Sequence, residues 1–214
     1  MRMINSLLPE EIEIILGSIL GDAWMTKTNQ GYEYIWFSHS DKQKQYLEWL
    51  YNSLPNVRTT HITEYHYKTG GYVRYQFSSK YNPKLTNYIR KVAYNGKTKC
   101  ITRKYLNLLT PLSIAVWWMD DGSLSVYDGE RRGKLCTHSF SLKENKIMQR
   151  YFKVVWGIES SIKTEKGKYY FIRLNATNMK KLVNIIYPYV EKVPGMIYKV
   201  DMKYKKDKYP FIVQ

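Results

Sequence analysis

The sequence predicts an α+β protein built from two copies of one unit of about a hundred residues. Two observations carry this prediction. Segments with helical spacing of apolar residues alternate along the chain with segments in which every second residue is apolar. Features of the first half also return in the second half in the same order. We expect one unit at residues 1–100, a second at residues 101–214, and a pseudo-twofold axis between them.

The two copies are recognised by pairs of features that lie 97 to 101 residues apart. Small changes of offset are what loop insertions produce. The pairs are Asp22 with Asp121, His39 with His138, Gln45–Tyr51 with Lys146–Phe152, Tyr75–Ile89 with Ile172–Ile186, and Lys99 with Lys199. No single pair is decisive, but their common order predicts a duplicated architecture.

The first copy begins with acids followed by apolar residues at helical spacing, which predicts a helix from Glu10 or Glu11 to about Trp24. Alternation in "GYEYIWFSHS" predicts a strand over residues 31–40. Asp41 follows this strand and is the expected cap of a helix that runs through Asn52.

Two strands joined at Thr69-Gly70-Gly71 come next, because a Gly-Gly pair between alternating segments indicates a hairpin. A helix from about Pro83 to Ala93 completes the copy. The second copy is expected to repeat the series as a helix over 112–121, a strand over 133–140, a helix over 142–156, a hairpin turning near Lys166-Gly167 and a helix over 177–190. Each unit is therefore αββαββα or a close variant.

The charge of the chain points to an anionic partner. Lys and Arg number 34 against 18 Asp and Glu, which gives a net charge of +16. We therefore expect a long anionic partner, nucleic acid before a membrane surface. Because the positive residues are spread over the whole chain, this partner should run across the fold. The apolar run "IAVWWM" is too short to span a bilayer. Cys100 and Cys136 form no CxxC pair, so free thiols are expected and a zinc site is not.

The strands offer a surface for that partner. Apolar and polar residues alternate in the hairpins, so one sheet face should pack on helices and the other should stay polar and basic. Such a face can lie in a DNA major groove and read base edges. The residues expected to contact DNA are Arg74, Gln76, Lys68, His39, His138, Lys163, Lys168, Arg173 and Asn175. For the two histidines, an outer metal shell is the alternative.

Two apolar helices each stop at an acid, Asp22 and Asp121. A carboxylate at a helix C-terminus is unfavourable, because it adds to the negative end of the helix dipole. A divalent cation would remove that penalty, and carboxylate oxygens suit Mg²⁺. Gly17 and Gly21 lie four residues apart, so the backbones of the two helices can approach closely there.

"ILGSILGDA" (Ile15–Ala23) and "IAVWWMDDG" (Ile114–Gly122) resemble the two motifs of a single-chain LAGLIDADG homing endonuclease. The resemblance implies a saddle of two antiparallel sheets over DNA, with the motif helices at the interface between the two repeats. It implies that Asp22 and Asp121 bind two or three Mg²⁺ and align water for hydrolysis of both strands at a long recognition site. Mn²⁺ is expected to substitute, and Ca²⁺ to bind without supporting cleavage.

The resemblance also implies a basic residue near each catalytic acid, and Lys99 and Lys199 match that placement best. Lys97 is the alternative to Lys99. The backbone carbonyls of Gly21 and Asp120 are further expected metal ligands. The second motif departs from the pattern, since Val116 and Asp120 replace small residues, and looser or asymmetric helix packing is expected there. The Asp120 side chain is assigned a structural or supporting role.

The sequence is compatible with two functions. The first is a monomeric, intron-encoded, site-specific DNA endonuclease. The alternative is an intron RNA maturase, or a nucleic-acid-binding protein of the same fold that has lost cleavage. Both motif acids are present, which favours the enzyme. Abundant Lys, Asn, Ile and Tyr indicate an AT-rich coding genome, so we expect a mitochondrion, a chloroplast or the cytoplasm of a low-GC bacterium.

Overall fold

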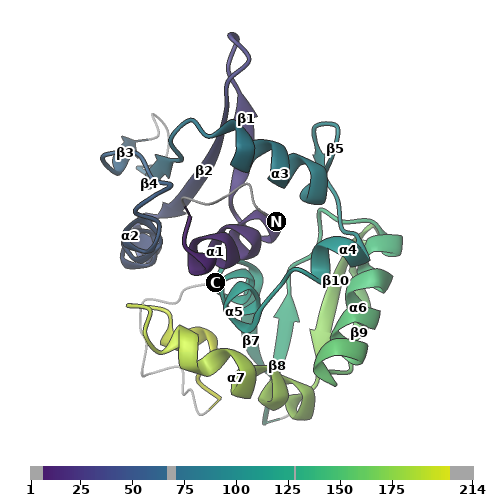
Figure 1. Cartoon of the computed structure of the whole chain (residues 1–214). Coiled ribbons are helices and arrows are strands. Elements are labelled where there is room, and N and C mark those ends of the chain that lie inside the picture. The colour runs from purple at the N-terminus through teal and green to yellow at the C-terminus, as the bar shows by residue number, and fades with distance from the viewer. Residues whose placement is uncertain (1–6, 67–70, 128, 203–214) are drawn as a thin grey trace.

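The computed structural model describes residues 7–66, 71–127 and 129–202, and its elements repeat in order (Figure 1). The first series is α1 (Pro9–Leu20), β1 (Trp24–Lys27), β2 (Glu33–Ser40), a 3₁₀ turn η1 (Asp41–Gln43), α2 (Lys44–Ser53), β3 (Thr63–His66), β4 (Val73–Ser78) and α3 (Pro83–Ala93). The second series is α5 (Pro111–Asp121), β7 (Gly122–Tyr127), β8 (Glu130–Leu135), α6 (Leu142–Trp156), β9 (Ser161–Glu165), β10 (Tyr169–Leu174) and α7 (Ala176–Val190).

Short elements join and follow these two series. The connection holds β5 (Tyr94–Asn95), β6 (Thr98–Lys99) and α4 (Arg103–Leu106), and the 3₁₀ turn η2 (Ile197–Lys199) comes after α7. The two larger sheets are antiparallel and have matching strand orders, β1-β2-β4-β3 and β7-β8-β10-β9. The expected α+β architecture with an αββαββα repeat is confirmed, while the boundary at residue 100 stays a prediction.

Several expected boundaries are wrong. The first helix ends at Leu20, because the backbone of its C-cap Gly21 leaves the helical region at φ −89° and ψ −125°, and Trp24 already belongs to β1. Asp41 lies in η1, so Gln43 rather than Asp41 stands at the N-cap of α2. The strand expected over 133–140 is β8, which ends at Leu135. Thr69 and Gly70 of the expected turn lie outside the described residues.

Helices α1 and α5 lie side by side at the centre of the molecule, between the two larger sheets (Figure 1). Gly17 in α1 and Gly21 at its C-cap face larger residues of α5. A Cβ placed on Gly17 would lie 2.8 Å from Val116 Cβ and would also meet the Ser113 backbone oxygen, and one on Gly21 would lie 2.5 Å from Asp120 Cβ. The packing is therefore asymmetric, as expected. It is not looser, since Val116 is fully buried.

Gly17→Ala is expected to lower the free energy of unfolding by about 1–3 kcal/mol, because the added methyl group overpacks the helix crossing. Alanine favours the helix over glycine by about 1 kcal/mol. A net decrease in the free energy of unfolding would therefore be due to the steric clash at the helix crossing. Denaturant unfolding measures the change. Asn87→Ala, at an exposed position of α3, is the control and should leave stability within about 0.5 kcal/mol.

Each large sheet has one buried face and one open face. In β2, Ile35 and Phe37 are buried among the helices, whereas Ser38 points to the other side and pairs with Gln76 of β4. Cross-strand partners share a face, so Gln76 is also on the open side. No helix among the described residues is long and apolar enough to cross a membrane.

Candidate active site

The two acids at the ends of the central helices lie in different surroundings. Asp22 follows the C-cap of α1, and its side chain is 48% exposed. Asp121 is the last residue of α5, is partly buried, and accepts a hydrogen bond from Trp117 Nε1 at 3.2 Å. Burial, and next the negative charge of Asp22, raise the pKa of the Asp121 carboxyl to about 7. The two acids are therefore electrostatically coupled.

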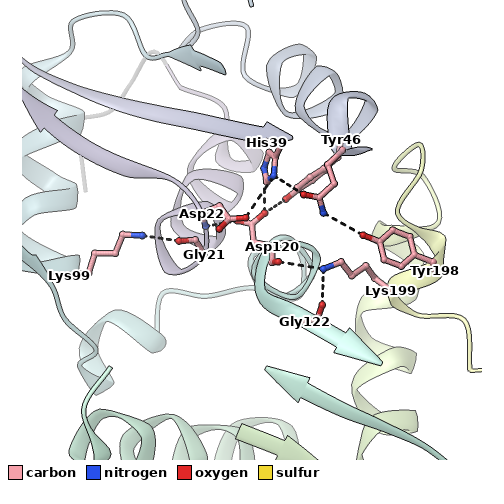
Figure 2. A network of polar contacts seen from close by, with 10 residues as sticks. Gly21, Asp22, His39, Tyr46, Lys99, Asp120, Gly122, Tyr198 and Lys199 are labelled. Atoms are coloured by element: carbon pink, nitrogen blue, oxygen red, sulfur yellow. Dashed lines mark hydrogen bonds and ion pairs between the residues drawn. The ribbon is translucent and has the colours of Figure 1, made fainter. Parts of the chain in front are cut away.

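Asp120 is buried between the two helices, and its side chain is only 1% exposed. Its Oδ1 accepts a hydrogen bond from Tyr46 Oη at 2.8 Å, and its Oδ2 accepts one from the backbone nitrogen of Asp22 at 3.1 Å (Figure 2). Burial, and next the charge of Asp22, raise the pKa of the Asp120 carboxyl well above its usual range. Asp120 therefore holds the backbone at Asp22 in place, which agrees with a supporting role.

Two lysines approach the ends of the central helices (Figure 2). Lys99 Nζ donates a hydrogen bond to the Gly21 carbonyl oxygen at 2.8 Å. Lys199 is 8% exposed, and its Nζ donates to the carbonyl oxygens of Gly122 at 2.7 Å and Asp120 at 3.4 Å. Burial lowers the pKa of both lysines, although the surrounding aspartates oppose this shift.

Lys97 does not take part in this arrangement. Its side chain is exposed in the turn between β5 and β6, whereas Lys99 points to the end of α1. Of the two candidates left open by the sequence, the structure therefore brings Lys99 to the acids.

The groups around the helix ends fit a divalent cation. The carboxylates of Asp22 and Asp121, and the carbonyl oxygens of Gly21 and Asp120, are hard oxygen donors of the kind that Mg²⁺ prefers. Both carbonyl oxygens accept hydrogen bonds from lysine ammonium groups, so both already face positive charge. The donor chemistry and its orientation thus suit a metal at this place.

His39 differs from its expected position. It lies on the buried face of β2, is 5% exposed, and packs on Tyr46 with 4.7 Å between ring centroids. It points to the motif helices rather than to the open face of the sheet, so it does not lie where a DNA-contacting residue was expected. Figure 2 shows it directed at Asp22 and Asp120. Its Nδ1 lies 3.8 Å from Asp22 Oδ2, and its Nε2 lies 3.8 Å from Asp120 Oδ1.

His138 is not the structural equivalent of His39. Trp24 pairs with Trp36, and Ser123, its counterpart 99 residues later, pairs with Lys134. Three residues beyond these partners stand His39 and Thr137, and Thr137 is also fully buried. The structural equivalent of His39 is therefore Thr137, 98 residues later, and not His138, 99 residues later. A step of one residue in an extended segment turns the side chain to the other face, so His138 does not share the buried position of His39.

Other DNA-contact candidates do lie on the open faces. Gln76 and Arg74 pair with Ser38 and Ser40 on the first sheet. A hollow of about 600 Å³ connects this face with Asp22, and Ser38, Ser40 and Arg74 are part of its lining. The open face of the first sheet therefore leads directly to one of the two acids.

On the second sheet, Arg173 pairs with Lys134 and also with Ser161, and Lys163 pairs with Phe171. These basic residues alternate with the buried Ile172 and Leu174 and therefore face outward. The open face of this sheet is positively charged.

The remaining residues expected to contact DNA do not lie on the central strands of the open faces, or lie outside the described residues. His138 Nε2 lies 3.2 Å from Glu165 Oε2, and Lys168 is exposed at the tip of the β9–β10 hairpin. Asn175 caps α7 by accepting a hydrogen bond from the Asn178 nitrogen at 2.9 Å, so its amide oxygen is already used. Lys68 lies outside the described residues.

Sequence reasoning missed Arg132, Lys134 and Tyr46. Lys134 and Arg132 lie on the open face of β8, opposite Ser123 and Ser125, and alternation through the "RGKL" stretch could have indicated both. Nothing in the sequence around Tyr46 indicates its hydrogen bond to Asp120, which is 74 residues away.

A model of the LAGLIDADG DNA endonuclease family matches residues 12–182. The chain belongs to this family. The match includes both motif helices and both large sheets of this LAGLIDADG protein. The antiparallel sheets flanking a central helix pair are thus the fold of the family.

Similar proteins include curated relatives and solved structures. Protein RecA of Mycolicibacterium chitae is 26% identical over 204 residues, which are 89% of this chain and 46% of that protein. Cytochrome b mRNA maturase bI2 of Debaryomyces hansenii is 29% identical over 199 residues, which are 89% of this chain and 73% of the maturase. The LAGLIDADG chain thus spans about half the length of the RecA relatives that it matches.

Among solved structures, the homing endonuclease I-WcaI bound to its DNA recognition sequence matches with a TM-score of 0.83. The match has 23% sequence identity and covers 93% of this LAGLIDADG chain and 89% of that chain. At this identity, the likeness establishes a common fold.

Proposed function

We propose that this protein is a site-specific DNA endonuclease that makes a double-strand break by Mg²⁺-dependent hydrolysis. One observation carries the proposal: Asp22 and Asp121 end the two central helices, and Lys99 and Lys199 point to the same helix ends. A protein that only bound nucleic acid would have no need for coupled carboxylates beside two lysines whose Nζ atoms are held at the helix ends. Perturbed carboxyl and lysine pKa values are also typical of catalytic sites.

Each group in this arrangement has a distinct task. Asp22 and Asp121 would hold the metal ions, together with the carbonyl oxygens of Gly21 and Asp120. When bound, Mg²⁺ supplies a Lewis acid and lowers the pKa of a water molecule. Lys99 and Lys199 would place fixed positive charge where the phosphate gains negative charge in the transition state.

The open sheet faces would hold the DNA. Arg74 and Gln76 on one sheet, and Lys163 and Arg173 on the other, present donors that can pair with base edges and phosphates. The net charge of +16 favours association with a polyanion and predicts strong salt dependence. I-WcaI is described as bound to its DNA recognition sequence, and this protein has the same fold.

The second candidate function is maturation of a host intron RNA. A relative of 29% identity is named as an mRNA maturase, and the alignment covers 73% of its length. This function is compatible with cleavage, because both motif acids are present. A monomeric protein acting in an organelle or a low-GC bacterium remains our proposal for its state and location.

A selection experiment tests the proposal. Purified protein is incubated with a randomised duplex DNA library in Mg²⁺, Mn²⁺ or Ca²⁺, and both bound and cut molecules are sequenced. We expect one long target to be cut in Mg²⁺ and in Mn²⁺, and to be bound without cleavage in Ca²⁺. Selection of a target without cleavage in any of these metals would contradict the nuclease and leave a DNA-binding protein.

A further inference from the structure

The side chains of Asp120 and His39 form a buried polar cluster beside Asp22. The proposed cleavage reaction uses the backbone carbonyl of Asp120 but neither of these side chains as a metal ligand. Their side chains are 1% and 3% exposed. Burying a carboxyl group and an imidazole among apolar helices is unfavourable unless each finds a partner. Tyr46 and the Asp22 backbone nitrogen each donate one hydrogen bond to Asp120, which leaves the side of this carboxylate toward His39 without a donor at hydrogen-bond distance.

The ring of His39 is oriented by a neighbour. Its Nδ1 lies 3.2 Å from Gln43 Oε1, an oxygen that only accepts, so the proton belongs on Nδ1. Nε2 then carries a lone pair and lies 3.8 Å from Asp120 Oδ1, too far for a hydrogen bond. Within residues 7–66, 71–127 and 129–202, Nε2 has no hydrogen-bond donor. An imidazole fixed by a carbonyl on its other nitrogen is the usual state of a metal-binding histidine.

The spacing of the three side chains suits one ion. One ligand atom each from Asp22, His39 and Asp120 lies within 4.8 Å of the others. Metal–ligand bonds of about 2.0–2.2 Å place two ligands of a tetrahedral ion about 3.4 Å apart. The 3.8 Å gap between His39 Nε2 and Asp120 Oδ1 exceeds this only slightly. The Asp22 Oδ2 atom lies 3.8 Å from the other ring nitrogen, Nδ1, and because the Asp22 side chain is half-exposed it has the freedom to turn toward Nε2.

The geometry points to a second cation site, formed by Asp22, His39 and Asp120, for a divalent transition ion of the Zn²⁺ or Co²⁺ class. A nitrogen ligand beside two carboxylates favours these ions over Mg²⁺, which prefers oxygen alone. Asp22 and His39 also help to line the hollow beside the first sheet, so water or an anion could reach an ion held there and complete its shell.

The site exists on one side of the molecule only. Gly21, at the C-cap of α1, corresponds to Asp120 of α5, and Thr137 corresponds to His39. The second repeat therefore lacks two of the three ligands. An ion at this site would take a carboxylate oxygen of Asp22 away from Mg²⁺. This competition with Mg²⁺ rests on the proposed function, whereas the binding of an ion by Asp22, His39 and Asp120 does not.

Cobalt binding to the metal-free protein, without DNA, tests the site. The chain has four histidines, so their imidazole NMR signals can be followed one by one while Co²⁺ is added. We expect the His39 signals to broaden first, at one equivalent of Co²⁺, together with visible absorption typical of a tetrahedral ion. A tenfold excess of Mg²⁺ should not displace the cobalt.

Three variants separate this site from adventitious binding. His39→Gln removes a ligand and is expected to weaken Co²⁺ binding at least tenfold, and Gln43→Leu, which keeps all three ligands, about tenfold. His138→Gln is the matched control and should bind as the wild type does. Circular dichroism verifies the fold of each variant. First broadening at the exposed His61 or His66, or unchanged affinity in His39→Gln, would overturn the proposal.

Because the experiment contains no DNA, its outcome is independent of cleavage. A protein that binds Co²⁺ at His39 but never cuts DNA would retain this site and lose the proposed nuclease function. A protein that cuts DNA but leaves His39 unaffected by Co²⁺ would retain the nuclease and lose this site.

Discussion

Replacing Asp22 or Asp121 by asparagine is expected to reduce double-strand cleavage at least about a thousandfold. Each substitution removes a charged oxygen ligand from the proposed metal site, a loss of several kcal/mol of transition-state stabilisation, and each 1.36 kcal/mol is tenfold in rate. Asparagine keeps the size of the side chain, and at Asp121 it keeps an oxygen for the Trp117 Nε1 donor. We therefore expect the variants to fold and to bind the target DNA.

Single-turnover cleavage of the selected target, beside an equilibrium binding assay, measures the two effects separately. Removing a negative charge next to the phosphates should leave DNA affinity equal to or slightly above that of the wild type. Asp41→Asn is the control, because Asp41 is exposed in η1. Cleavage by either variant within tenfold of the wild-type rate would show that the motif acids do not hold the catalytic metal.

The duplicated fold could be predicted because it leaves a periodic record in the sequence. The helices of both halves have apolar faces and recognisable ends, such as Ser141 and Glu144, which cap α6 reciprocally. The end of α1 leaves no such record, since the apolar pattern continues through Ala23 to Met25. The helix stops instead because of the backbone geometry at Gly21. The strand β1 also leaves no record in the sequence, because four residues are too few to show an alternation of apolar and polar residues.

The site could be predicted only in part. Asp22, Asp121, Lys99 and Lys199 stand out because the repeat places them in matching positions. The burial of Asp120 depends on Tyr46, which is distant in sequence, and no local pattern reports such a contact.

His39 shows a second limit of the sequence. A constant spacing of 99 residues pairs His39 with His138 in the sequence. If the alignment of an extended segment shifts by one residue, however, buried and open faces are exchanged. Register is fixed by strand pairing, which the sequence of one chain does not display.

Asp121→Asn is also expected to stabilise the metal-free protein at pH 8, although it inactivates the proposed enzyme. The pKa of the Asp121 carboxyl is about 7 in the folded protein, against 3.8 ordinarily. Between these values the folded protein holds a proton that the unfolded chain has lost, so stability falls as pH rises through this window. At 1.36 kcal/mol per pH unit, the carboxylate costs up to about 4 kcal/mol above pH 7.

Asparagine has no proton to lose, so the variant should escape this loss. Urea unfolding in EDTA is expected to show equal stability of the two proteins near pH 4 and a growing advantage of the variant up to pH 8. The cost belongs to the metal-free state, because a bound divalent cation compensates the same carboxylate. Millimolar Mg²⁺ should therefore stabilise the wild type at pH 8 and leave the variant nearly unchanged. Equal stability of both proteins at pH 8 in EDTA would mean that the Asp121 carboxylate is already compensated by the lysines, and that no cation is needed to relieve it.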